Sequence, residues 1–391
     1  MFEGTDPLPT DPILGLSIAM KADPRPGKID LGVGVYKDAN GTTPIMAAVR
    51  SAERHVFEAQ TTKAYTPMAG FPGFVDEIKT MLFGEEIAER TDGIQAPGGC
   101  GALRIGGELL ASRGAKRIVV GSPTWANHIP LLSSAGLTVE TIPYYDSQSR
   151  TIDFDAFIGE VKKLGPADTL LLHGACHNPT GADLSIEQWK VVADIAAERG
   201  FLPFIDTAYH GFAGGLDVDS EPVRIMAGAV DELLVSYSCS KNFGLYRERT
   251  GGLFVTTRQP ALAKALATHM MSIARGNYSM PPAYGGAIVT TIMQSPELRT
   301  AWRDELEAMR LDVVGKRALL AKTAERHGVG NSLGFIPSQN GMFSLVPVSK
   351  AQATALREDH GIYMTLAGRV NICGFSADNV DKFCEAYKAV L

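Results

Sequence analysis

The sequence predicts an α/β fold with a mostly parallel central sheet in a large domain, and a smaller α+β domain built from both termini. Between about residues 46 and 295, short apolar runs alternate with segments of helical period, which is typical of parallel strands joined by helices. A long helical stretch and short strand-like pieces follow. A chain of 391 residues is long enough for two domains. We therefore expect a large domain over 46–295 and a small domain formed by 1–45 and 296–391.

Individual elements follow from apolar patterning and from turn residues. A helix is expected over Ser185–Glu198, where Ser185 and Gln188 have the spacing of a capping box. Residues 1–45 are rich in proline and glycine and are expected to form loops. Apolar runs predict buried strands at Arg117–Gly121, Thr138–Tyr144, Thr169–His173, Phe201–Asp206, Glu232–Ser238 and Gly252–Thr256. Towards the C-terminus we expect a helix over about 297–327, strands at Phe343–Val346 and Arg369–Ile372, and a final helix ending in Tyr387.

Composition excludes several classes of protein. The net charge of -6 argues against nucleic acid as the main partner, because phosphate backbones require clustered positive charge. No apolar run approaches the roughly 18 residues of a membrane helix. The five cysteines are odd in number and form no C-x-x-C pair, which argues against a disulfide framework or a metal site and favours a reducing compartment. The N-terminal residues lack the profile of a signal peptide. We expect a cytoplasmic protein without a metal.

A candidate catalytic lysine follows the strand expected at Glu232–Ser238. Lys241 lies in Ser238-Cys239-Ser240-Lys241-Asn242, and Arg249 follows eight residues later. Ligands of open α/β sheets bind beyond the carboxyl ends of the strands. Hydroxyl groups together with an arginine suit an anionic phosphate, and a lysine amine suits an aldehyde cofactor. A single lysine in such a loop is more often merely solvated, so this assignment depends on its neighbours.

A candidate charge partner closes the strand expected at Phe201–Asp206. Asp206 could cap the following turn, or its carboxylate could face a protonated ring nitrogen. At about 4 Å and an effective dielectric constant near 20, such a pair is worth roughly 4 kcal/mol, which is about three pKa units. A pyridine that stays protonated at neutral pH is the electron sink on which pyridoxal 5'-phosphate (PLP) chemistry depends.

The segment Ala96–Leu103 is a glycine-rich turn that runs into a helix. Backbone N–H groups at a helix N-terminus bind phosphate without side chains. The glycine spacing differs from the dinucleotide fingerprint, because Arg104 stands where the last glycine would be, and the chain has no G-x-x-x-x-G-K-[ST] motif. The turn therefore indicates a phosphate site of another kind.

Three motifs resemble the class I aspartate and aromatic aminotransferases. They are His177-Asn178-Pro179-Thr180-Gly181, Asp206-x-x-Tyr209 and Ser238-x-Ser240-Lys241-Asn242-Phe243-Gly244-Leu245-Tyr246-x-Glu248-Arg249. The likeness runs from Asp11 to Asn371, in the order found in the family. It implies the fold-type I architecture of PLP-dependent transferases, a homodimer, and active sites at the subunit interface.

The resemblance implies a role for each matching residue towards the cofactor. Lys241 would form the Schiff base with PLP and move the proton in the reaction, and Asp206 would pair with the pyridine nitrogen, oriented by His128. Asn178 and Tyr209 would donate to the phenolic oxygen of the ring. Trp125 would stack on the ring. The phosphate would be held by a set that comprises Gly99, Cys100, Ser238, Ser240, Arg249 and, from the neighbouring subunit, Tyr65.

The resemblance also implies a substrate site. Arg369 would bind the α-carboxylate through a bidentate pair, under the backbone of Gly34. Trp125 and Asn178 would touch the substrate too. Arg275 would reach from the neighbouring subunit to a second carboxylate. Taken singly, these residues have structural alternatives, since an aromatic side chain can belong to a core or interface and an arginine to a surface ion pair.

Departures from the family pattern bear on specificity. Cys100 stands where threonine is usual, and a thiol is a weak donor. Ala64 and Met280 occupy positions that carry asparagine in strictly aspartate-selective members, whereas Lys37 and Thr43 keep the aspartate-type pattern. Ala64 lacks an amide that could hold Arg275, and Met280 offers a flexible, polarizable surface for a ring.

We therefore expect a PLP-dependent transaminase that moves the amino group between an aromatic or dicarboxylic L-amino acid and 2-oxoglutarate. The alternative is a strictly aspartate-selective aminotransferase. More remotely, a PLP-dependent lyase would keep Lys241, Asp206 and Arg369 but would have little use for Arg275. A PLP-domain transcription regulator would need a basic DNA-binding module, and a nicotinamide dehydrogenase would need the missing glycine fingerprint.

Overall fold

The computed structural model describes residues 2–8 and 12–391. In the helix that begins at Pro12, it describes the side chains from residue 15 onward. Asp11, where the resemblance begins, lies outside the described residues. Two compact units are present. The larger unit comprises Thr43–Asp312 and Gln339–Gly341, and the smaller unit comprises Met1–Thr42, Val313–Ser338 and Met342–Leu391. A PLP-binding domain over 46–295 stays a prediction.

The larger unit is built on a mixed seven-stranded sheet. Within this sheet β10 runs in the opposite direction to the other six strands, so the α/β fold with a mostly parallel sheet is confirmed. In spatial order the strands are β2 (Thr91–Pro97), β10 (Thr250–Thr257), β9 (Glu232–Ser238), β8 (Leu202–Thr207), β7 (Asp168–His173), β3 (Arg117–Ser122) and β4 (Thr138–Pro143).

All six strands predicted in this region are present, and β2 is the addition. Its sequence, Thr-Asp-Gly-Ile-Gln-Ala-Pro, lacks an apolar, β-branched run, so no local preference marks it as a strand. Pairing with β10 along its whole length supplies its hydrogen bonds. The buried amide of Gln95 is satisfied as well, because it accepts from the Phe71 N–H at 2.8 Å and donates to the Pro282 carbonyl at 2.8 Å.

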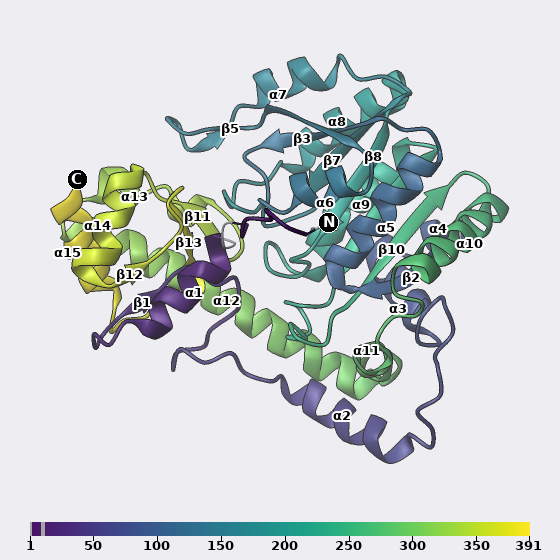
Figure 1. Ribbon diagram of the computed structural model, residues 1–391, viewed down its shortest axis with the longest axis horizontal. Coiled ribbons are helices and arrows are strands. Elements are labelled where there is room, and N and C mark those ends of the chain that lie inside the picture. The colour runs from purple at the N-terminus through teal and green to yellow at the C-terminus, as the bar shows by residue number, and fades with distance from the viewer. Residues whose placement is uncertain (1, 9–11) are drawn as a thin grey trace. The chain divides into compact units, whose positions relative to one another are not determined.

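Helices cover this sheet. α5 (Gly98–Ser112) packs on β9 and β10, and α10 (Pro260–Asn277) packs on β2 and β10. α8 (Ile186–Arg199) begins with the predicted capping box of Ser185 and Gln188. α2 (Ala47–Ala59) lies alongside α11 (Ala283–Gln294) (Figure 1). The other helices of this unit are α3 (Phe74–Phe83), α4 (Glu85–Ala88), α6 (His128–Ser134), α7 (Phe154–Val161) and α9 (Leu216–Ala229), and a small hairpin joins β5 (Tyr145–Asp146) to β6 (Thr151–Ile152).

The smaller unit joins segments from both ends of the chain. β1 (Ile29–Asp30) pairs in parallel with β12 (Ile362–Tyr363), and β11 (Phe343–Leu345) pairs with β13 (Arg369–Asn371). The long predicted helix is α12 (Pro296–Arg326), which contributes to both units; the others are α13 (Gly330–Leu333), α14 (Lys350–His360) and α15 (Val380–Val390), which extends past Tyr387.

The expectation that residues 1–45 form only loops is wrong for α1 (Pro12–Ala22), which is a helix. The prolines near it suggested a loop, but proline is favoured in the first turn of a helix, where its missing N–H would have no intrahelical partner. Leu16 on this helix is buried.

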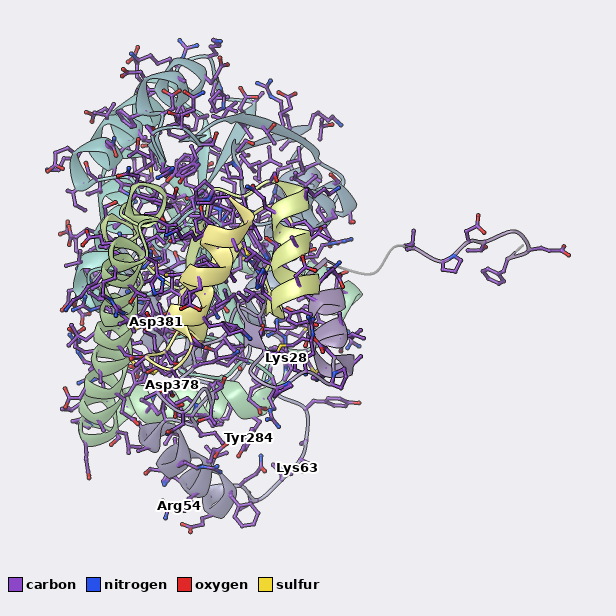
Figure 2. All side chains as sticks on the ribbon, turned by 90° about the vertical axis from the view of Figure 1, so that its left-hand side faces the viewer. Lys28, Arg54, Lys63, Tyr284, Asp378 and Asp381 are labelled. Atoms are coloured by element: carbon purple, nitrogen blue, oxygen red, sulfur yellow. The ribbon has the colours of Figure 1, made fainter. Side chains whose placement is uncertain are left out.

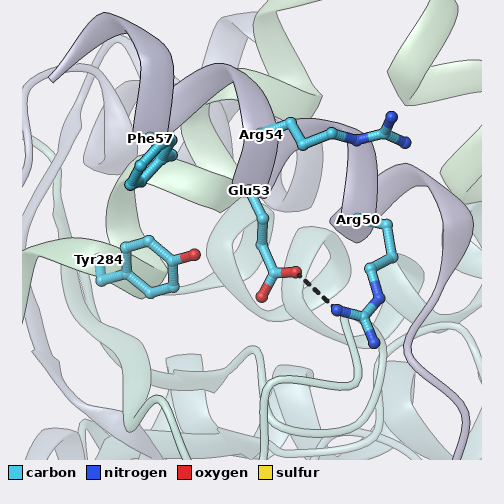
Figure 3. Close-up of a pocket in the computed structure, with 5 residues that line it drawn as sticks. All are labelled: Arg50, Glu53, Arg54, Phe57 and Tyr284. Carbon is cyan, nitrogen blue, oxygen red and sulfur yellow. Dashed lines mark ion pairs between the residues drawn. The ribbon is translucent and has the colours of Figure 1, made fainter.

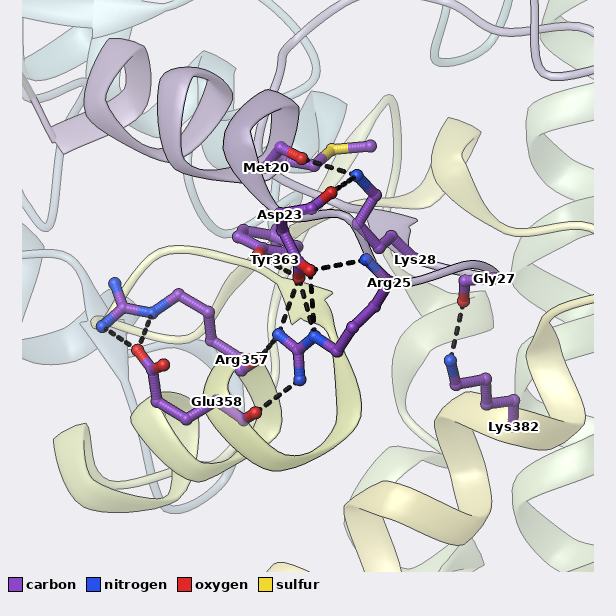
Figure 4. A network of polar contacts seen from close by, with 9 residues as sticks. All are labelled: Met20, Asp23, Arg25, Gly27, Lys28, Arg357, Glu358, Tyr363 and Lys382. Carbon is purple, nitrogen blue, oxygen red and sulfur yellow. Dashed lines mark hydrogen bonds and ion pairs between the residues drawn. The ribbon is translucent and has the colours of Figure 1, made fainter.

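One arginine links the N-terminal segment to α14 within the smaller unit (Figure 4). The Arg25 guanidinium binds both carboxylate oxygens of Asp23, with its Nε at 3.0 and 2.9 Å, and donates to the carbonyls of Arg357 and Glu358 at the end of α14. The Tyr363 hydroxyl donates to the same carboxylate at 2.6 Å. These bonds hold the pKa of Asp23 well below its ordinary value, with the Arg25 side chain as the main cause.

Among residues 2–8 and 12–391, no helix combines the length and the apolar character needed to cross a membrane.

Close packing of α5 on the sheet gives a stability test. A Cβ atom on Gly106 would lie 2.6 Å from Cζ of buried Phe204, so Gly106→Ala should lower the free energy of unfolding by about 1–3 kcal/mol. Gly159 in α7 is the matched control, because a Cβ there meets no atom within 4 Å. Gly159→Ala should be neutral or stabilising by up to about 1 kcal/mol. Urea unfolding measures both, and equal effects would contradict this account.

Candidate active site

The carboxyl ends of three parallel strands carry polar side chains side by side. The pairing register sets His173 of β7 opposite Asp206 of β8, and Asp206 opposite Ser236 of β9. Asp206 and Ser236 are buried, among apolar neighbours that include Ile205 and Val235. A one-residue slip of the register would turn these side chains to the other face of the sheet. The register therefore creates this polar row.

Asp206 ends a chain of hydrogen bonds. The Ser236 hydroxyl donates to its Oδ1 at 2.6 Å, and Nε2 of His128 lies 3.2 Å from its Oδ2. Thr124 Oγ1 lies 2.8 Å from His128 Nδ1 and 3.1 Å from His173 Nε2. If His173 donates to Thr124, Thr124 to His128, and His128 to Asp206, every atom has a matching role with both imidazoles neutral. The aspartate is the final acceptor.

The same contacts keep Asp206 charged. Burial is the largest single influence and raises its pKa, but the hydrogen bonds from His128 and Ser236 and the nearby imidazoles together lower the pKa below its ordinary value. Burial next to His128 lowers the pKa of His173 to about 3, so His173 is neutral at physiological pH. The result is a buried carboxylate beside an uncharged His173.

The amine of Lys241 is buried and interacts electrostatically with Asp206. Its Nζ lies 4.5 Å from the centre of the Tyr209 ring. Burial lowers the pKa of the lysine to about 8, although the charge of Asp206 acts in the opposite direction. An amine with such a pKa is largely neutral in mildly alkaline solution, and a neutral amine can act as nucleophile or base.

A cradle for an anion lies at the N-terminus of α5. Gly98 has a φ of 69°, and a Cβ on it would lie 2.8 Å from a guanidinium nitrogen of Arg249. A Cβ on Gly99 would lie 3.3 Å from the Cβ of Ser238, whose Oγ donates to Ser240 Oγ at 3.1 Å. Arg249 itself has a φ of 52°, a left-handed conformation that is unfavourable for an arginine and is found mostly where function demands it.

The remaining predicted cofactor residues lie in the larger unit too. Trp125 packs edge-to-face on His128, with ring centres 5.2 Å apart. Asn178 and Tyr209 are buried, and Asn178 Nδ2 lies 3.5 Å from the Tyr209 hydroxyl. Cys100 is partly buried at the start of α5, and burial raises the pKa of its thiol, so the thiol stays protonated.

The predicted α-carboxylate residues come together in the smaller unit. The Arg369 guanidinium donates to the Gly32 carbonyl at 2.7 Å and lies 4.4 Å above the Phe343 ring. A Cβ on Gly34 would lie 2.8 Å from the same ring, so only glycine fits at that position without displacing the ring. Asn371 Nδ2 donates to the carbonyls of Val33 and Val35 at 2.6 and 2.8 Å, which fixes the loop around Gly34.

Two predicted residues are not brought to the others within one chain. Tyr65 is 90% exposed. Arg275, in the last turn of α10, is exposed and hydrogen-bonds to the Ser279 hydroxyl. Both were expected to serve a neighbouring subunit.

A separate hollow of about 450 Å³ lies between α2 and α11 (Figure 3). It is lined by Arg50, Glu53, Arg54, Phe57 and Tyr284, and Arg50 pairs with Glu53 at 3.7 Å. None of the predicted site residues lines it. Over the described part of the chain, no group of three or more His, Cys, Asp or Glu side chains could hold a metal ion.

Sequence reasoning missed Thr124 and Ser236 as partners of the site. Ser236 lies in the strand expected at Glu232–Ser238, and Thr124 immediately precedes Trp125, so both are close to residues already singled out. Their roles depend on strand register and on the position of α6, which a single sequence does not contain.

The residues present fit PLP. Asp206 has one protein donor on each oxygen, and a carboxylate can accept further bonds, so a ring N–H is compatible with it. Gly98 and Gly99 leave open backbone at a helix N-terminus beside Arg249 and two serine hydroxyls, which suits a phosphate.

The buried imidazoles give a pH test. His173 has a pKa of about 3, against an ordinary value of 6.5, so the unfolded chain takes up its proton first as the pH falls. The free energy of unfolding should therefore fall with pH below about 6.5, by up to roughly 1.4 kcal/mol per pH unit for this group. His173→Gln, which keeps a donor for Thr124, should reduce that slope, and exposed His269→Gln should not. Urea unfolding between pH 7.5 and 5 measures it, and equal slopes in all three proteins would contradict the assignment.

Comparison with known proteins gives the family. The model of the aminotransferase class I and II family matches residues 26–386. The chain is 43% identical over 396 residues to the aspartate aminotransferase of Escherichia coli (strain K12), covering 100% of both chains. It is 45% identical over 376 residues to the tyrosine aminotransferase of Rhizobium meliloti (strain 1021), covering 96% of each.

Solved structures agree. The crystal structure of the aromatic-amino-acid aminotransferase from Burkholderia pseudomallei, covalently bound to pyridoxal phosphate, matches with a TM-score of 0.96 and 38% identity, over 100% of this chain and 99% of that one. The chain belongs to the class I and II aminotransferases and is a PLP-dependent enzyme.

Proposed function

We propose that this aminotransferase moves the amino group between an aromatic or dicarboxylic L-amino acid and 2-oxoglutarate, with Lys241 as the residue that bonds to PLP. The observation that carries the proposal is the grouping, in one unit, of a lysine with a pKa near 8, a buried charged aspartate and an anion cradle. Relatives named for aspartate and for tyrosine support both substrate classes.

Bound PLP supplies an aldehyde that condenses with amines and a ring that withdraws electrons from the carbon bearing the amino group. Asp206 would hold a proton on the ring nitrogen, since its carboxylate is kept charged by His128 and Ser236. The aspartate serves this purpose only while His128 points a donor at it. Thr124 and His173 are therefore positioning residues for Asp206.

Lys241 would act twice. In the resting enzyme its amine would hold the cofactor, and during turnover it would act as the base that moves the proton at Cα of the substrate. A pKa lowered from 10.5 to about 8 favours both tasks, because it increases the fraction of neutral amine near neutral pH. The hydrophobic surroundings of its side chain produce that value.

The phosphate and the ring would be held by the other predicted residues. Arg249, Ser238, Ser240 and the amides of Gly99 and Cys100 would bind the phosphate. Trp125 would stack on the ring, while Tyr209 and Asn178 would donate to its hydroxyl oxygen. A hydrogen bond to an ionised oxygen stabilises the ionised form and so adjusts the pKa of the bound group.

The α-carboxylate of every substrate would bind Arg369. The guanidinium is fixed from one side by the Gly32 carbonyl and from another by the Phe343 ring, so it is held before substrate arrives. A planar guanidinium offers parallel donors that match a carboxylate. The backbone at Gly34 lies on the same ring and would contact the carboxylate.

Tyr65 and Arg275 would act across a homodimer, completing the site of a second copy. The support for this is their exposure: Tyr65 lies on the segment that follows α2, and Lys63 on that segment and Arg54 on α2 are exposed as well (Figure 2). Because it is 90% exposed, Tyr65 buries little of its side chain in its own chain. Both side chains are available to a partner.

Dual specificity would follow from the mobility of Arg275. Its guanidinium suits the second carboxylate of aspartate, glutamate and 2-oxoglutarate, but an aromatic ring in its place would leave it without a counter-charge. Its exposed position lets it turn to solvent. Ala64 and Met280 would leave room and apolar surface for the ring.

Five free cysteines support a reducing compartment, which we propose is the cytoplasm.

Replacing the lysine tests the proposal most directly. Lys241→Ala should abolish transamination while the protein stays folded, whereas exposed Lys190→Ala in α8 should keep wild-type kcat. Borohydride reduction and peptide mapping should find the PLP label on Lys241. A label on another lysine would overturn the assignment.

Replacing the outer arginine tests specificity. Arg275→Leu should lower kcat/KM for aspartate by about 10² to 10³, as expected when one partner of a desolvated charge pair is removed, and should leave phenylalanine within a few-fold. Arg258→Leu, which removes an exposed arginine paired with Asp231, is the control. A wild-type preference for aspartate over phenylalanine beyond about 10⁴, or more than 5 kcal/mol, would mean a strictly aspartate-selective enzyme.

Mixed dimers separate action within a chain from action across the dimer. A Lys241→Ala chain combined with an Arg275→Leu chain forms one site with both residues intact only if Arg275 serves the neighbouring subunit. Recovery of aspartate turnover on mixing supports the shared site, and no recovery in confirmed hybrids contradicts it.

A further inference from the structure

Behind Lys241 lies a chain of three buried polar side chains. Asn242, the next residue, places its Nδ2 2.6 Å from the Tyr237 hydroxyl. That hydroxyl lies 3.0 Å from Nδ1 of His210, whose Nε2 lies 2.8 Å from the Leu216 carbonyl. All three side chains are at most 1% exposed, and none of them belongs to the catalytic or cofactor set described above.

The direction of these hydrogen bonds is determined. The Leu216 carbonyl only accepts, and the Ser220 hydroxyl, 2.9 Å from His210 Nε2, donates to that same carbonyl at 2.9 Å, so Nε2 carries the hydrogen. Burial lowers the pKa of His210 to about 4, so the ring is neutral and Nδ1 is an acceptor. The Tyr237 hydroxyl therefore donates to His210 and accepts from the Asn242 amide. One tautomer of one histidine sets the orientation of the amide beside Lys241.

The backbone at Lys241 is held from the other side too. The Trp302 indole N–H donates to the Asn242 carbonyl at 2.7 Å, and the Trp302 ring stacks on Phe243 with centres 4.4 Å apart. The Gly244 N–H donates to the Lys241 carbonyl at 3.1 Å, which closes a turn. Asn242 is thus held by two hydrogen bonds, one from its side chain to Tyr237 and one to its backbone carbonyl from Trp302.

One acceptor of Asn242 is left unsatisfied by these hydrogen bonds. Asn242 Oδ1 is buried and has no hydrogen-bond partner among the described residues. A buried acceptor without a partner is destabilising, and an apolar side chain would avoid that. The hydrogen bond that this side chain makes is the one from its amide to Tyr237.

We propose that His210, Tyr237 and Asn242 form a positioning network that orients the backbone of Lys241, so that its amine meets the aldehyde carbon of the cofactor and then Cα of the substrate. The inference rests on the proposed role of Lys241. The three are positioning residues, since they act through Lys241 and touch no reacting atom. A small rotation at Asn242 would swing the long lysine side chain, and misplacement by about 1 Å can slow a reaction by roughly 10²-fold.

The test compares two ligands of the PLP-free protein. PLP can bond to Lys241, whereas 4'-deoxypyridoxine 5'-phosphate offers the same ring and phosphate without the aldehyde. Tyr237→Phe removes only the hydroxyl of the network. It should weaken the binding of PLP about tenfold and change the affinity for the analogue by less than twofold. It should also lower kcat with KM nearly unchanged. Fluorescence titration gives both dissociation constants, and the melting temperature of the PLP-free protein verifies folding.

Two further variants make the test specific. His210→Gln can still accept from Tyr237 and donate to Leu216, so it should retain PLP binding, whereas His210→Leu should behave like Tyr237→Phe and replaces it if that variant does not fold. Tyr387→Phe is the control, because it removes an equally buried tyrosine hydroxyl, one that donates to the Pro347 carbonyl at 3.0 Å. It should leave the ratio of the two affinities unchanged.

The outcomes distinguish this inference from the proposed function. If Tyr237→Phe weakens both ligands equally, or neither, the network does not position Lys241 and the inference is wrong. Lys241→Ala should remove the preference for PLP over the analogue. If Lys241→Ala keeps that preference, the proposed role of Lys241 fails instead.

Discussion

Asp206 has to keep a negative charge in a position where burial alone would favour its neutral form. Two hydrogen bonds achieve this, one from Ser236 on the next strand and one from His128, which is oriented in turn through Thr124 and His173. The charge then influences its surroundings, because it raises the pKa of Lys241 against the opposing effect of burial. The buried carboxylate is therefore the constraint to which the other ionisable groups of the site are adjusted.

This arrangement depends on the geometry of a parallel sheet. Strands β7, β8 and β9 are in register, so residues from three distant parts of the sequence stand in one row at their carboxyl ends. The apolar residues that precede them anchor the register by burial. His173 is kept neutral by the same burial, so it provides a hydrogen-bond partner without adding competing charge.

The antiparallel strand β10 has a separate function in the site. It pairs with β9 on one side and with β2 on the other, with Gly251 opposite both Ser238 and Ala96. Arg249 immediately precedes β10, and Gly98 immediately follows β2. The antiparallel pairing therefore returns the chain from Lys241 to the N-terminus of α5 and brings the guanidinium against Gly98. Without it, the serines and the arginine would lie at opposite ends of the sheet.

The amino-acid sequence by itself determined the α/β class, the six apolar strands, the capped helix α8 and the residues of the main motifs, because apolar period, turn residues and motif spacing are local properties. It did not determine α1, β2 or the partners of the site. A proline near a helix start and a strand with Asp92, Gly93 and Gln95 have no clear local preference. Thr124, Ser236 and the network of His210 and Tyr237 acquire their roles only when strands and helices distant in sequence pack together, since hydrogen-bond partners and pKa values depend on distance and burial.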